Sequence, residues 1–489
     1  MDPPTPGGGA PTDPREPADP AATNLGAVDA PTAIERRELA FAGVARQAEL
    51  VRGGEVSPRE LVETALERIQ RLDPELNAFR IVFGERALTE ADQAAGRAGA
   101  GDERPLLGVP IAVKDDQPVA GTPRVRGSSA HGGPEPADSE IVRRLREAGA
   151  IVIGITRTPE LCIWPFTETA AGGATRNPWD PQRTPGGSSG GPAAAVAAAL
   201  VPASTASDGA GSIRIPAACC KLFSLKPQRD RISVAPLKEA WNGLSAYGFL
   251  TRSVADSALL YEVVTGLAYV AAAKREPGTL RIALSTRMPP GLPAKLDPEW
   301  RRAAFQTAEL LGSLGHEVTE REPDLSQAMG TRVVTRYLAG LADEVRAVEH
   351  PERLERRTVA MARLGALARR QLGRARAAEA ADAARVNRIF DEFDVVLGPT
   401  LAGAPFAIGA YEGRGAARTF QAVLRWVPFN GVWNHIGNPA AAVPAGFDAH
   451  GLPLSVQLAA RSDGEETLFA LSHQLEAARP WADRRPPVS

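Results

Sequence analysis

The sequence predicts an α/β fold with a central mixed, mostly parallel β-sheet that is covered by helices on both faces. Three consecutive segments carry this prediction: an apolar run at 109–114, a helical run that ends at Glu147, and the apolar run IVIGIT at 151–156. A strand, a helix and a strand in this order form a parallel pair with the helix on one face. The 489 residues are 44% hydrophobic, which suffices for a sizeable core.

Helices are expected in the N-terminal part of the chain. The first is expected over 34–51, and the second begins at the sequence SPRE (57–60), a capping box with proline at the first helical position. This second helix should run to about Arg71, because Pro74 stops it. A further helix is expected at about 85–98.

Helices and strands alternate through the rest of the chain. Asp138 or Ser139 is expected to cap the helix that ends at Glu147, and Gly149 follows its end. Strands are expected at 280–285, 316–322 and 393–399, and helices at 251–267, 299–314 and 359–388. The last helix is rich in Arg and Ala, and its basic face is expected to be solvated because no aromatic side chains interleave with the charges.

Composition and charge exclude several classes of protein. The 56 Lys and Arg residues nearly balance the 58 Asp and Glu residues, so no nucleic-acid partner is expected. No run reaches the length of about 18 apolar residues that a membrane-spanning helix needs, so no membrane partner is expected. Cys162, Cys219 and Cys220 form no disulfide framework and favour the reducing cytoplasm. No Cys/His spacing resembles a zinc site.

The stretch 185–216 holds two serine sites among glycines, PGGSSGG and SDGAGS, separated by the run AAAVAAALV. It predicts a Gly/Ser turn, a buried helix, a short strand near 203–206 and a second Gly-rich turn. Glycines permit tight turns and let backbone N–H groups approach a ligand closely. A serine beside such a turn can act as a nucleophile next to a ready oxyanion hole.

Other interpretations of this stretch compete. GGSSG at 186–190 matches the G-x-S-x-G nucleophile elbow, which would need His and Asp partners elsewhere in the chain. A phosphate-binding loop would end in GK[ST], and no such ending occurs here. Two purely structural Gly/Ser turns are the third interpretation, and the second serine loop at a fixed distance speaks against it.

Three motifs together resemble the amidase signature of the amidase signature family. They are PGGSSGG (185–191), SDGAGSIRIPAACC (207–220) and LKPQRDRIS (225–233). GVPIAVKDD (108–116) is similar to the strand that carries the catalytic lysine of this family, and the likeness extends from Glu38 to Pro487. The chain looks most like bacterial amidases of the actinobacterial type.

The resemblance implies one large amidase signature domain. It would span 33–487 and follow a disordered tail at 1–32, where eight Pro and four Gly stand with almost no large apolar side chains. Its parts would be the N-terminal helices at about 34–98, a catalytic core at about 105–270 and a C-terminal part at about 278–487.

The resemblance also implies a Ser–cis-Ser–Lys triad and its surroundings. Ser212 matches the nucleophile, Ser188 the bridging serine that follows a cis peptide bond, and Lys114 the base. Gly209, Ala210 and Gly211 match the loop whose N–H groups form the oxyanion hole. The supporting residues would be Ser189, then Asp208 and Arg214, which brace the loop, and Cys162, Ile163 and Trp164, which fall where the family lines its acyl pocket.

The chemistry of this triad restricts the surroundings of the lysine. A lysine with the ordinary pKa near 10.4 is almost entirely charged at neutral pH and is then a poor base. Burial at the end of an apolar strand would favour the neutral form that a base needs. A carboxylate close to the amine would favour the charged form, so Asp115 and Asp116 are expected to point away from Lys114.

The sequence departs from the family pattern at four positions that are usually glycine. These positions hold Ala210, Lys221, Ser224 and Asp230. If the backbone at any of them has a positive φ, the side chain costs on the order of 1 kcal/mol. The segment 426–436 is expected at the mouth of the substrate site through Asn430, Trp433 and Asn434, whereas His435 is expected to be structural because the triad needs no histidine.

The leading functional hypothesis is a cytoplasmic serine hydrolase that cleaves a small-molecule carboxylic amide to an acid and ammonia or an amine. No metal or organic cofactor is implied, and a homodimer is compatible with the resemblance. One alternative is the glutaminase subunit of a tRNA-dependent amidotransferase, which would need partner subunits. Others are a catalytically silent binding protein on the same fold and a Ser-His-Asp hydrolase. The acyl and amine groups of the substrate stay open.

Overall fold

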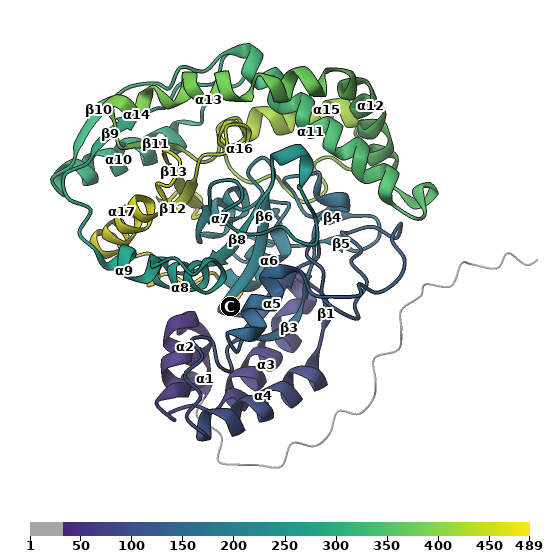
Figure 1. Ribbon diagram of the computed structural model, residues 1–489, viewed down its shortest axis with the longest axis vertical. Helices are drawn as coiled ribbons and strands as arrows, with labels where there is room; N and C mark the ends of the chain where they lie inside the picture. The colour runs from purple at the N-terminus through teal and green to yellow at the C-terminus, as the bar shows by residue number, and fades with distance from the viewer. Residues whose placement is uncertain (1–32) are drawn as a thin grey trace, which may run out of the picture.

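A computed structural model describes residues 33–489, so the tail expected at 1–32 lies outside the described residues. Their centre is one eleven-stranded sheet with helices on both faces (Figure 1). Its strands, in spatial order, are β1 (Phe79–Val82), β3 (Ile151–Thr156), β2 (Pro110–Lys114), β6 (Ala203–Asp208), β8 (Ala246–Thr251), β7 (Phe223–Lys226), β12 (Ala440–Phe447), β13 (Pro453–Ala460), β11 (Val395–Pro399), β9 (Arg281–Leu284) and β10 (Glu317–Glu320).

The sheet is mixed, as predicted. Parallel pairing occurs in two groups, β3–β2–β6 near one edge and β11–β9–β10 at the other. The strands between these groups pair antiparallel, and β12 and β13 form a hairpin in which Phe447 lies opposite Pro453. Every residue of β2, β3, β6 and β13 is buried, which is typical of strands covered on both faces.

The first expected helix is interrupted. Two helices, α1 (Ala33–Phe41) and α2 (Gly43–Arg52), replace the single helix expected over 34–51. Gly43 has φ 82°, and a Cβ there would lie 2.5 Å from the carboxylate of Asp256. The chain therefore turns at Gly43, where the side chain of Asp256 leaves no room for a larger residue.

The second expected helix runs further than predicted. α3 (Pro58–Leu76) begins with the predicted capping box between Ser57 and Glu60, but it continues past Pro74. Pro74 lies in the last turn, so the backbone hydrogen bond that it cannot donate is one of the last in the helix. The helix ends instead at Asn77, whose φ of 52° is left-handed and whose N–H donates to the carbonyl of Asp73.

Two groups of helices surround the sheet. Those that pack on its strands are α4 (Gly84–Gly99), α6 (Gly190–Ala197), α7 (Arg214–Cys220), α8 (Val254–Thr265), α10 (Pro298–Ser313) and α17 (Glu465–Ala478), with α5 (Glu140–Glu147) and α9 (Tyr269–Lys274) beside them. The second group lies along the upper side in Figure 1 and comprises α11 (Gln327–Ala347), α12 (Arg356–Ala377), α13 (Glu379–Asn387), α14 (Ile389–Glu392), α15 (Ala416–Trp426) and α16 (Gly431–His435). The small hairpin of β4 (Glu168–Thr169) and β5 (Gly173–Ala174) completes the fold.

Two of the four usual glycine positions have a left-handed backbone. Lys221 has φ 59° and Asp230 has φ 65°, whereas Ala210 and Ser224 do not have a positive φ. Lys221 is buried, donates a hydrogen bond to the carbonyl of Arg484 and lies over two aromatic rings, while Asp230 is exposed. The contacts of Lys221 thus offset the backbone strain at this residue, whereas no buried contact offsets the strain at Asp230.

Replacing these residues by glycine is therefore expected to have opposite effects. Asp230→Gly should raise the free energy of unfolding by up to about 1 kcal/mol, because the strain is relieved and no buried contact is lost. Lys221→Gly should lower it, because the hydrogen bond to Arg484 and the contacts with the aromatic rings disappear. Urea unfolding measures the change in the free energy of unfolding for each variant. Changes of the same sign in both variants would contradict this explanation.

Candidate active site

A buried lysine lies at the centre of the candidate site. Lys114 is the last residue of β2, and its side chain is completely buried. Its Nζ donates hydrogen bonds to Ser188 Oγ at 2.8 Å and to Ser207 Oγ at 2.7 Å. Ser188 precedes α6, and the peptide bond between Gly187 and Ser188 is cis, as the resemblance implies. The structure thus brings the lysine and the first serine of PGGSSGG into direct contact.

The expectation that both carboxylates point away from the lysine is wrong for Asp116. Its Oδ2 lies 3.2 Å from Lys114 Nζ and also accepts a hydrogen bond from Ser207. Asp115 and Asp116 form a turn directly after β2, and this turn brings the carboxylate of Asp116 back to the side of Lys114. Asp115 does point away and pairs with Arg80 at 2.8 Å. Burial raises the pKa of Asp115 to about 6, against the opposing effect of Arg80.

Ser212 lies in the loop between β6 and α7 and is half-buried. The two serine loops are tied together by Ser189, whose N–H donates to the carbonyl of Ser212 at 3.3 Å and whose hydroxyl donates to the carbonyl of Ser207 at 3.4 Å. This arrangement holds the second serine loop against the residues that contact the lysine.

The oxyanion loop differs in one respect from the expectation. The N–H of Gly211 donates to Asp208 Oδ1 at 2.5 Å and is therefore occupied. Within residues 33–489, the N–H groups of Gly209, Ala210 and Ser212 have no hydrogen-bond partner, so these three are the available donors. Glycine is still required at 211: its φ is 123°, and a Cβ would lie 2.7 Å from Ile215 Cδ1.

A buried ion pair stabilises the oxyanion loop. Asp208 accepts hydrogen bonds from Arg214 Nε at 2.9 Å and Nη2 at 3.0 Å, and both side chains are fully buried. Arg214 also donates to Gln457 at 2.6 Å and to Asn434 at 2.6 Å. Burial raises the pKa of Asp208, but the attraction of Arg214 outweighs it and the net shift is well below the usual range. Asp208 is therefore a carboxylate that orients Gly211 and the start of α7.

Removing this charge is expected to destabilise the protein. Asp208→Asn would leave Arg214 buried without a counter-ion, which costs about 3 kcal/mol. The free energy of unfolding in urea measures the effect. Glu466→Gln serves as the control, because it breaks an exposed pair with Arg275 and should change stability by less than about 0.5 kcal/mol. Similar losses in both variants would contradict the supporting role of Asp208.

The segment 426–436 approaches the site from the C-terminal half of the chain. Asn434 Nδ2 donates to Asp208 Oδ1 at 2.9 Å, and Asn430 lies against Gly211. His435 is buried and contacts Asp382 Oδ2 at 2.9 Å, and burial lowers its pKa. Its hydrogen-bond partners lie outside the group around Lys114, which agrees with the structural role expected for it.

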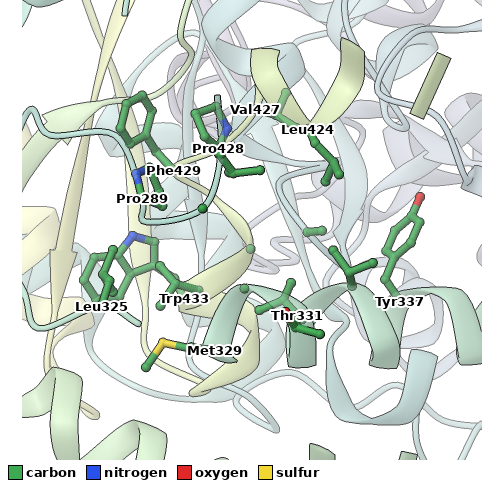
Figure 2. A pocket seen from close by; sticks show the side chains of 18 of the residues that line it. Pro289, Leu325, Met329, Thr331, Tyr337, Leu424, Val427, Pro428, Phe429 and Trp433 are labelled. Carbon is green, nitrogen blue, oxygen red and sulfur yellow. The ribbon is translucent and has the colours of Figure 1, made fainter. Parts of the chain in front are cut away.

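Two cavities meet at Ser212. The apolar cavity has a volume of about 390 Å³, and Figure 2 shows side chains of α11 and α15 pointing into it from two sides. The polar cavity has a volume of about 420 Å³ and contains Ser188, Ser207 and Asp116 in its wall. Ser212 and Tyr337 line both cavities, so they mark the boundary between them.

The three residues expected in one acyl pocket are separated. Trp164 lines the apolar cavity, and Cys162 lines the polar cavity. Ile163 lines neither cavity, and its carbonyl accepts a hydrogen bond from the Tyr337 hydroxyl. Burial raises the pKa of Cys162 to about 12, so its thiol is protonated at neutral pH.

Sequence reasoning missed Ser207 and Tyr337. Ser207 belongs to the SDGAGS motif and points toward Lys114 from β6, the strand next to β2. That neighbourhood depends on the strand order, which no local pattern shows. Tyr337 comes from α11, a helix for which the sequence carries no signature motif. Both residues reach the site only through the tertiary fold.

Fold and site place the chain among the hydrolases that act on amide C–N bonds. It belongs to the amidase family, whose model matches residues 60–469. AmiB2 of Mycobacterium tuberculosis is 51% identical over 462 residues, which cover 93% of this chain and all of the relative. The 6-aminohexanoate-cyclic-dimer hydrolase of Paenarthrobacter ureafaciens is 35% identical over 486 residues, which cover 90% of this chain and 95% of the relative.

A solved structure of 6-aminohexanoate cyclic dimer hydrolase superposes with a TM-score of 0.84 at 32% identity and covers 92% of this chain and 99% of its own. The protein is thus an amidase signature enzyme with a single large domain, and it acts on small-molecule amides. Among residues 33–489, no helix is both long and apolar enough to cross a membrane.

Proposed function

We propose that the protein hydrolyses a carboxylic amide through a Ser–cis-Ser–Lys triad and an acyl-enzyme on Ser212. The observation that carries this proposal is the 2.8 Å hydrogen bond between the buried Lys114 Nζ and Ser188 Oγ, because Ser188 and Ser212 line the same cavity. A serine hydroxyl attacks an amide only when a base takes its proton. Lys114 is the base, and Ser188 passes the proton from Ser212 to it.

The reaction then has two halves. In the first, Ser212 Oγ bonds to the carbonyl carbon, and the N–H groups of Gly209, Ala210 and Ser212 stabilise the oxyanion. The proton returns through Ser188 to the nitrogen, the C–N bond breaks and the amine leaves. In the second half, water attacks the acyl-enzyme, the same relay removes its proton and returns it to Ser212, and the acid leaves. Ser207 and Asp116 hold the lysine amine throughout.

The relatives support this proposal over the alternatives. The name of the 35% identical relative describes the hydrolysis of a cyclic amide dimer. A silent binding protein would not need a buried lysine bonded to two serines, and a glutaminase subunit would need partner subunits. The three cysteines are free thiols, which favours the cytoplasm. A homodimer stays a prediction.

The direct test of the proposed function is product analysis. The purified protein is incubated alone with a series of simple primary and secondary amides, and the acid and amine are quantified by mass spectrometry. Equal amounts of both products from at least one amide support the proposal. Release of ammonia only from glutamine, and only when partner subunits are added, would support the amidotransferase alternative instead.

A further inference from the structure

The two cavities at Ser212 differ sharply in chemical character. Among the described residues that line the apolar cavity, Arg287 alone is charged. Most of its wall is aliphatic and aromatic, with Met329, Leu424, Val427, Phe429 and Trp433 among these side chains, and Figure 2 shows them converging on one space. A few neutral polar side chains also line it. A volume of about 390 Å³ is within the usual range of small-molecule sites. This cavity suits an apolar group.

The polar cavity is lined by charged residues that are largely paired with one another. Arg124 binds Glu135 at 2.7 Å, and Arg126 binds Glu344. His131 also lines it, and burial together with Arg126 lowers the pKa of His131 to about 4, so this side chain is neutral at pH 7. A group bound here meets hydrogen-bond donors and acceptors on several sides.

The chemistry of the reaction orients the substrate between these cavities. When the C–N bond breaks, the leaving nitrogen must receive a proton, and the relay delivers that proton from Ser188. Ser188 lines the polar cavity and does not line the apolar one. The nitrogen and everything attached to it therefore lie on the polar side. The substituent on the acyl carbon that is bonded to Ser212 then lies on the side of the apolar cavity.

We infer that the acyl group of the substrate occupies the apolar cavity and the leaving amine occupies the polar cavity. This inference rests on the proposed function. The substrate class is therefore an amide with a sizeable apolar acyl group and a polar amine part. The covalent step is the one described above: the Ser212 Oγ–C bond forms, the C–N bond breaks, and the proton of Ser212 ends on the leaving nitrogen.

Helix α11 offers variants that test each side separately. Gly330, near its start, lines the apolar cavity, and a Cβ added there would meet no atom within 4 Å. Ala347, its last residue, lines the polar cavity. Gly330→Leu and Ala347→Leu thus each narrow one cavity. Gly373 lies on α12, has open space beside it and lines neither cavity, so Gly373→Leu is the matched control.

The experiment compares kcat/KM for acetyl and octanoyl amides of the same amine, 4-aminobutanol, and for the octanoyl amide of pentylamine. The six additional methylene groups should raise kcat/KM at least about 100-fold. The hydroxyl of aminobutanol should give about a 5-fold advantage over pentylamine. Gly330→Leu should lower kcat/KM at least about 10-fold for the octanoyl amide while the acetyl amide changes less than about 2-fold. Ala347→Leu should instead change kcat/KM according to the amine part of the substrate. Gly373→Leu should change neither dependence.

Binding to Ser212→Ala separates this inference from the proposed function. Calorimetry on this variant, with and without Gly330→Leu, measures the affinity for the octanoyl and acetyl amides without turnover. Octanoyl binding that Gly330→Leu weakens at least about 10-fold supports the acyl assignment even if the wild type shows no hydrolysis. Equal affinity for both acyl lengths would overturn the inference, and so would a Gly330→Leu effect that follows the length of the amine.

Discussion

Ser212→Ala is expected to lower kcat for amide hydrolysis by about 10⁵-fold or more, the scale of loss when a nucleophilic serine is removed from a hydrolase. The reason is that no other group can form the acyl-enzyme from the same loop. The expected loss is confined to kcat, because the two cavities that bind the substrate keep their shape. Steady-state kinetics with the best amide from the substrate series measure it.

Ser189→Ala is the matched control for this variant. Ser189 is buried beside Ser188 and joins the two serine loops, but its hydroxyl reaches only the carbonyl of Ser207, at 3.4 Å. Its loss should lower kcat less than about 10-fold. If Ser189→Ala abolished activity while Ser212→Ala retained it, the nucleophile would lie in the first serine loop and not at Ser212.

Lys114→Met should lower kcat by about 10³- to 10⁴-fold, the range expected when a general base is lost. Methionine has a similar volume and fits an apolar strand end, so the loss would reflect the missing amine. Ser188 would then have no acceptor for the proton of Ser212. The rate of covalent labelling by a fluorophosphonate should fall in this variant by a factor similar to the fall in kcat, because labelling needs the same activated hydroxyl.

Lys226→Met provides the control for burial. Lys226 is also almost fully buried, burial lowers its pKa to about 7, and its Nζ donates to the carbonyl of Pro227. It lies outside the relay, so kcat should change only a few-fold. If both methionine variants lost activity equally, general damage from replacing a buried lysine would explain the result. If Lys114→Met changed only KM, Lys114 would not be the base.

The elements that the sequence predicts well are those with a clear local pattern. β3 (IVIGIT) and α5 follow from an apolar run and a short helix between glycines, and both occur where expected. β8 was not predicted, because its sequence AYGFLT holds a glycine and reads as a loop. Thr251, expected as the start of a helix, is the last residue of that strand, and Ser253 caps the helix after it. Such boundaries depend on neighbouring strands rather than on local propensity.

The candidate site divides in the same way. Lys114, Ser188 and Ser212 lie in compact motifs, so the resemblance identifies them residue by residue, and the structure brings Lys114 and Ser188 into contact. The sequence predicts that Asp116 points away, because a nearby carboxylate favours the charged form of a lysine, but the turn after β2 brings it back to Lys114. Trp164 and Trp433, both expected at the substrate site, line the apolar cavity, but most of its wall could not be predicted, because it comes from α11 and α15, far apart in the sequence.

Ser212 is expected to form the covalent intermediate. The most direct test is to label the folded wild-type protein with a fluorophosphonate, measure its intact mass and map the modified peptide. We expect a single adduct on Ser212 that is absent from Ser212→Ala and forms much more slowly in Lys114→Met. An adduct on Ser188 or Ser189, or none at all in a protein that hydrolyses amides, would contradict it.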